Sequence, residues 1–137
     1  MAIFQPEGWH TVTPRIVVRD VDGFVEFVKN VFGATGEIRA GLPTELRIGD
    51  SIVMVSGEGQ RDQWPAFLYV YVEDIDATYQ RAIEADATSV EAPSDMPYGD
   101  RRAMVSDDWG NVWQMATHQH DLSLEEIRDR VEQADKR

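Results

Sequence analysis

Hydrophobic positions along the chain follow first a strand-like and then a helix-like spacing, and this order occurs twice. Residues 13–20 and 66–73 are rich in β-branched and aromatic side chains, which predicts a strand in each. Each strand leads into apolar residues at helical spacing, and an acidic residue at the start of each helix can accept backbone N–H groups as an N-cap. The candidate caps are Asp20 or Asp22 for the first helix, which ends at Gly33, and Asp74 or Asp76 for the second.

Three further strands are predicted after each helix. They are residues 37–40, 44–48 and 51–55 in the first half, and 89–91, 102–106 and 112–116 in the second. Such an internal duplication is a stronger signal than any single strand. It predicts one α+β domain of tandem βαβββ modules, about 8–56 and 64–118, whose curled mixed sheets surround a cavity. A capping box of Ser123 and Glu126 predicts a C-terminal helix over residues 122–135, laid on the domain or on a partner subunit.

Alternation along the strands assigns their side chains to two faces. One face is apolar, as expected beneath the two helices. The opposite face mixes aromatic rings with a guanidinium and an amide, which is typical of a small-molecule pocket, although the same face could instead fill a closed barrel or a dimer interface. The candidate ligand-binding residues on this face and its loops are Arg15, Met54, Trp64, Phe67, Tyr69, Tyr71, Tyr98 and Gln114.

Composition narrows the classes of partner. The 137 residues carry a net charge of −12, so nucleic acid and membrane surfaces are poor partners, whereas a cationic ligand is attracted. Cysteine is absent, which excludes thiol nucleophiles and fits a cytoplasmic location. The sequence shows neither a secretory signal nor an apolar run long enough to span a membrane.

Three histidines and one aspartate are further candidates for chemistry. His118 and His120 share a face of a continued strand and could bind a divalent metal with a carboxylate, or could simply be solvated. His10 precedes the first strand and could reach the mouth of the cavity. For Asp100, an Asp–Arg pair that fixes the hairpin is favoured over contact with a ligand.

Residues 10–20, residues 95–101 and the run 106–118 resemble the vicinal oxygen chelate superfamily. This superfamily includes glyoxalase I, extradiol dioxygenases and bleomycin-resistance proteins, and the chain looks most like its PhnB-like branch over residues 8–120. The resemblance implies metal ligands on the first and fourth strands of each module, at Thr13, Met54, Phe67 and Gln114. Only Gln114 offers a plausible oxygen donor there, and a catalytic site needs about three ligands, so we predict no cofactor and a lost metal site.

Three functions remain open. The first is a metal-independent protein of the bleomycin-resistance type, a homodimer that sequesters an aromatic or cationic small molecule. The second is a glyoxalase- or dioxygenase-like enzyme with an altered metal set, such as Gln114 with His10 or His118, or with general acid–base groups alone. The third is a dimerisation module without a ligand.

Overall fold

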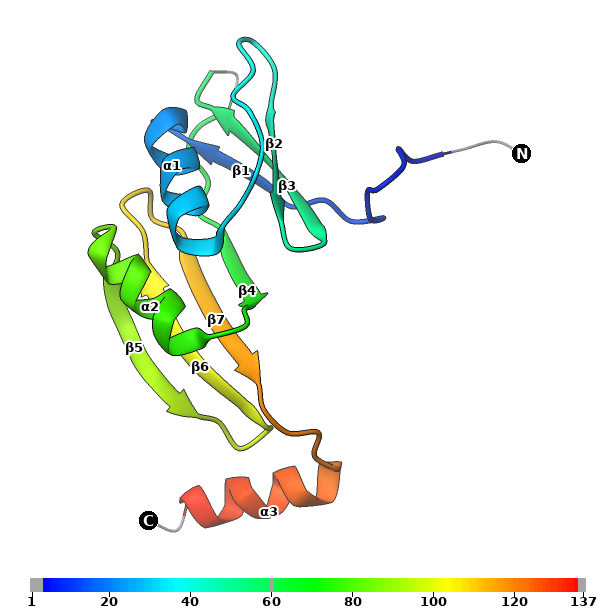
Figure 1. Ribbon diagram of the computed structural model, residues 1–137, viewed down its shortest axis with the longest axis vertical. Coiled ribbons are helices and arrows are strands. Elements are labelled where there is room, and N and C mark those ends of the chain that lie inside the picture. The colour runs from blue at the N-terminus through cyan, green and yellow to red at the C-terminus, as the bar shows by residue number, and fades with distance from the viewer. Residues whose placement is uncertain (1–3, 60, 136–137) are drawn as a thin grey trace. The chain divides into compact units, whose positions relative to one another are not determined.

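The computed structural model describes residues 4–59 and 61–135, which form two compact units, Met1–Ala66 and Phe67–Arg137 (Figure 1). Each unit has its own β-sheet, and the fold is α+β as the sequence predicts.

The first unit places one helix on a three-stranded sheet. Its elements are β1 (Arg15–Val18), α1 (Val21–Phe32), β2 (Thr44–Ile48) and β3 (Ser51–Gly57). The sheet order is β1-β3-β2, with β1 parallel and β2 antiparallel to β3. Asp20 caps α1 by accepting from the Gly23 N–H at 3.0 Å, and Gly33 ends it in the left-handed conformation, so both predicted ends are confirmed. The apolar stripe of α1 is buried, as are the strand residues Ile16 and Val18.

The strand predicted over residues 37–40 is wrong, so the first unit is βαββ within the described residues. The chain pairs with β2 at a single bridge between Thr35 and Arg47. Gly36 then adopts a φ of 141°, and a Cβ there would strike the carbonyl oxygen of Glu45. This turn leads the following residues away from the hydrogen-bonding edge of β2.

The second unit contains the complete predicted pattern. Its elements are β4 (Phe67–Tyr71), α2 (Ile75–Glu84), β5 (Thr88–Asp95), β6 (Asp100–Ser106) and β7 (Val112–His118), followed by α3 (Leu124–Asp135). The sheet order is β4-β7-β6-β5, with β4 parallel to β7. Asp74 caps α2 by accepting from the Ala77 N–H at 3.1 Å. α2 packs against β5, β6 and β7, above a core that includes Val105, Trp113 and Met115.

The C-terminal helix α3 follows the predicted capping box. The Ser123 hydroxyl accepts from the Glu126 N–H at 3.1 Å, and Glu126 accepts from the Ser123 N–H at 3.3 Å. None of its described residues is buried, and Leu124 is 71% exposed. Over the described residues, no helix is both long and apolar enough to cross a membrane.

Candidate functional site

The edge strand β4 presents three aromatic rings on one face of the second sheet. Phe67, Tyr69 and Tyr71 alternate with Leu68 and Val70, so the three rings share a side. The strand register shows that this side points away from α2. Phe67 pairs with Val112 and shares its face, whereas the next residue, the buried Trp113, lies on the opposite face, which α2 covers. The rings are 67%, 39% and 63% exposed in chain order, and the centroids of the two tyrosine rings lie 5.3 Å apart. We call Phe67, Tyr69 and Tyr71 the aromatic face.

A buried carboxylate on β6 fixes the two tyrosines. Asp100, which is 2% exposed, accepts from the Tyr69 hydroxyl at 2.7 Å and from the Tyr71 hydroxyl at 3.1 Å. His118 Nδ1 lies 2.7 Å from its other oxygen. Burial opposes ionisation of Asp100, but the hydrogen bonds from His118, Tyr69 and Tyr71 outweigh it and hold the carboxyl pKa below its ordinary value. The aromatic face is therefore supported by a satisfied buried charge.

His118, at the end of β7, lies between two carboxylates. Its Nδ1 contacts Asp100 and its Nε2 contacts Asp121, each at 2.7 Å. The hydrogen bonds to Asp100 and Asp121 raise the pKa of His118. Both ring nitrogens face acceptors, so the imidazolium form, in which both nitrogens donate, suits this geometry.

A second polar group continues this network toward β5. The Arg102 guanidinium donates to the Tyr98 hydroxyl at 3.0 Å and to Glu91 at 2.8 Å, while the hydroxyls of Tyr98 and Tyr69 lie 3.4 Å apart. Burial, followed by the hydrogen bonds to Tyr98 and Asp100, raises the pKa of Tyr69, so its hydroxyl stays neutral and can donate. The tyrosine rings are thus held by strands β4, β5, β6 and β7 together.

The first unit carries a pocket on the sheet face opposite α1. Arg15, Val17, Arg61, Asp62 and Trp64 line this space of about 480 Å³, which we call the Trp64 pocket. Trp64 forms an antiparallel bridge with Val17 along the edge of β1, and its side chain is 77% exposed. The backbone N–H of Arg19 donates to the Gln63 side chain at 3.3 Å, which helps to hold this segment beside the sheet.

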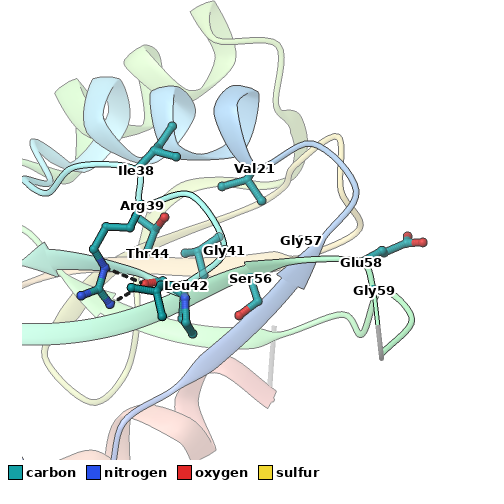
Figure 2. Close-up of a pocket in the computed structure, with 12 residues that line it drawn as sticks. Val21, Ile38, Arg39, Gly41, Leu42, Thr44, Ser56, Gly57, Glu58 and Gly59 are labelled. Atoms are coloured by element: carbon teal, nitrogen blue, oxygen red, sulfur yellow. Dashed lines mark hydrogen bonds between the residues drawn. The ribbon is translucent and has the colours of Figure 1, made fainter.

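A further pocket of about 460 Å³ lies on the α1 side of the first sheet (Figure 2). Figure 2 shows Val21 of α1 with Ile38 and Leu42 of the loop before β2 around this space. The Arg39 guanidinium already donates to the Pro43 carbonyl and to Glu45. This pocket is largely apolar and offers few free directional groups, so we do not assign the ligand to it.

The structure groups the predicted site residues into two sets. Tyr69, Tyr71 and Tyr98 lie within one hydrogen-bond network, and Phe67 and Gln114 share their face, because Gln114 pairs in register with Tyr69. Arg15 and Trp64 line one pocket, while the half-buried Met54 pairs in register with Arg15. That these residues bind a ligand stays a prediction.

The Asp–Arg pairing expected for Asp100 is wrong. Asp100 faces the tyrosines, whereas the Arg101 guanidinium donates to Asp76 at 3.0 and 3.1 Å and to Asp95 at 3.2 Å. Consecutive strand residues point to opposite faces, so neighbours in sequence were the wrong partners. The same alternation places Asp100 and Arg102 together and could have identified both as members of the network.

The side chains at the four positions where the superfamily's metal enzymes carry their ligands do not fit a metal site. They are a hydroxyl at Thr13, a thioether at Met54, a phenyl ring at Phe67 and an amide at Gln114. Over residues 4–59 and 61–135, no group of three or more His, Asp or Glu side chains is arranged so that it could hold a metal ion. His118 directs its two nitrogens at Asp100 and Asp121.

The family model for the glyoxalase/bleomycin resistance protein/dioxygenase superfamily matches residues 9–115. The chain belongs to this superfamily. An uncharacterized protein of Mycobacterium bovis, Mb0911c, is 29% identical over 135 residues, covering 85% of this chain and 89% of that protein. Among solved structures, TioX from Micromonospora sp. ML1 has a TM-score of 0.70 and 26% identity, covering 80% of this chain and 98% of TioX. The fosfomycin resistance protein FosX from Mesorhizobium loti shares the fold, with a TM-score of 0.62 at 18% identity over 85% of this chain and 95% of FosX.

Proposed function

We propose that this superfamily member is a metal-independent binding protein for aromatic or cationic small molecules. The observation that carries the proposal is the aromatic face, where two tyrosine rings are locked by Asp100 while Phe67 and Tyr71 stay mostly exposed. Exposed rings held in place form a stacking surface that loses little entropy when a planar ligand binds. A cation can also lie over a tyrosine ring, with an attraction of about 0.5–1 kcal/mol at exposed sites.

The two units would each contribute an open sheet face. The second offers the aromatic face with the Gln114 amide, and the first offers Trp64 with the Arg15 guanidinium. Burying one aromatic side chain against a ligand is worth about 1.5–3 kcal/mol, so two or three rings contribute about 3–9 kcal/mol. A dissociation constant of 1 mM corresponds to about 4 kcal/mol and one of 1 μM to about 8 kcal/mol, so the rings support binding in the millimolar to micromolar range. The superfamily name includes bleomycin resistance proteins, and on that ground we propose sequestration of a toxic compound as the biological role. The cytoplasmic location and the homodimer stay predictions.

Isothermal titration of the purified protein with a panel of planar and cationic antibiotics tests this proposal. We expect at least one compound to bind saturably, and Phe67→Ala and Tyr71→Ala to weaken that binding about tenfold each. Phe4→Ala is the matched control, because Phe4 is 88% exposed and lies outside both sets of site residues. Binding that the control weakens as much as the two variants would contradict the proposal. A dimer that binds no compound of the panel would favour the dimerisation module.

One observation favours an enzyme as the second candidate. His118 lies between Asp100 and Asp121, and its raised pKa favours the protonated ring. The Nε2 proton is held by the fully exposed Asp121, so a bound substrate that displaces this carboxylate would receive the proton from a general acid. The test is to incubate each bound compound with the protein and to search for products by mass spectrometry. Turnover that His118→Gln abolishes while binding persists would establish catalysis, and an unchanged compound would exclude it for that ligand.

A further inference from the structure

The lining of the Trp64 pocket differs in charge from the chain as a whole. The protein carries a net charge of −12, yet two of the five lining residues are arginines and only Asp62 is acidic. Arg15 donates to the neutral Ser56 hydroxyl at 3.3 Å, and neither Arg15 nor Arg61 makes an ion pair with a described residue. Two other exposed arginines of the same unit do make ion pairs: Arg19 pairs with Glu58, and Arg39 pairs with Glu45.

The apolar part of the pocket is exposed to solvent. The Trp64 indole is 77% exposed, although the segment that carries it is tied to β1 by the bridge to Val17. An exposed indole on a backbone held beside a pocket of about 480 Å³ offers a stacking surface near two guanidinium groups. The planar, delocalised guanidinium binds carboxylates through paired N–H donors and also stacks on aromatic rings.

We propose that the Trp64 pocket binds a planar organic anion, such as an aromatic carboxylate, with its ring against Trp64 and Val17 and its charge at Arg15 and Arg61. This inference rests on the proposed function, because it assigns a ligand class to one of the two open faces. The two sites then differ in the ligand charge that they prefer: the aromatic face suits neutral or cationic rings, and the Trp64 pocket suits anionic rings. Asp62 disfavours an anion of more than one charge, so a single carboxylate is the best match.

Three probes of one shape test the proposal: 2-naphthoate, 2-naphthamide and 2-naphthylmethylammonium. Their affinities are measured by isothermal titration, and their location by the indole N–H signals in ¹H–¹⁵N spectra. The four tryptophans give one indole signal each, and the Trp64 signal is assigned by its loss in Trp64→Phe. We expect naphthoate to bind about tenfold more tightly than the amide and to shift the Trp64 signal.

Arginine variants decide whether the charge of the pocket is responsible. Arg15→Gln with Arg61→Gln should reduce naphthoate to the affinity of the amide, whereas Arg128→Gln, an exposed arginine on α3, should leave it unchanged. Circular dichroism confirms that the variants remain folded. Equal affinity for all three probes, or binding that leaves the Trp64 signal in place, would overturn the inference and leave the proposed function standing. Binding of no probe anywhere on the protein would overturn the inference and also count against the proposed function.

Discussion

Replacing Asp100 by asparagine tests whether this carboxylate holds the aromatic face together. The side chain is 2% exposed and accepts three hydrogen bonds, two from tyrosines at one oxygen and one from His118 at the other. Asparagine has the same shape, but an NH₂ group replaces one carboxylate oxygen and cannot accept hydrogen bonds. The hydrogen bonds at that position are lost, and those at the remaining oxygen are made to a neutral acceptor instead of a charged one. Hydrogen bonds to a charged group contribute about 1.5–3 kcal/mol each and neutral ones about 1 kcal/mol. We therefore expect Asp100→Asn to lower the free energy of unfolding by about 3 kcal/mol.

Urea denaturation followed by circular dichroism measures this loss, and the assigned ring ¹H signals of Tyr69 and Tyr71 report the environment of the two rings. Asp108→Asn is the control, because Asp108 is exposed in the turn between β6 and β7, and it should unfold at the wild-type midpoint. Asp100→Asn should also bind aromatic ligands more weakly, since the rings are no longer fixed. A variant as stable as the wild type would refute the claim that Asp100 organises the face.

Two further perturbations address the same region. His118 has a raised pKa, so its stabilising contribution is complete below its ordinary pKa of about 6.5 and is lost as the pH rises through the raised value. Stability should therefore fall as the pH rises above about 6.5, and His118→Gln should flatten this slope in urea midpoints measured as a function of pH; an unchanged slope would contradict the assignment. Gly99 has a φ of 99°, and a Cβ there would strike the carbonyl oxygen of His120, so Gly99→Ala should displace the loop that carries Tyr98. We expect that variant to lower the thermal midpoint by several degrees and to weaken ligand binding, whereas Gly59→Ala, where nothing lies within 4 Å, should do neither.

Features fixed by local chemistry could be predicted from the sequence. The caps at Asp20 and Asp74 and the left-handed Gly33 depend on a few neighbouring residues, and so does the capping box of α3. The alternation of β4 likewise predicts that Phe67, Tyr69 and Tyr71 share one side. These are the parts of the fold for which residue type and spacing alone decide the geometry.

Features that depend on partners distant in sequence could not be predicted as well. Residues 37–40 resemble a strand, but the turn at Gly36 prevents them from pairing with β2. Asp100 stands beside Arg101 in the sequence, yet it contacts Tyr69, Tyr71 and His118 on two other strands. The Trp64 pocket brings Arg61 next to Arg15 only because residue 64 pairs with Val17.

The central claim is that the open sheet faces bind a small planar ligand without a metal. The most direct measurement compares the affinity of one ligand for the protein dialysed against EDTA with its affinity after addition of Ni²⁺, Zn²⁺, Fe²⁺ or Mn²⁺, with the metal content determined by elemental analysis. The account predicts the same affinity in every sample and less than about 0.1 equivalent of metal in the dialysed protein. Binding that appears only with a stoichiometric metal ion would contradict it.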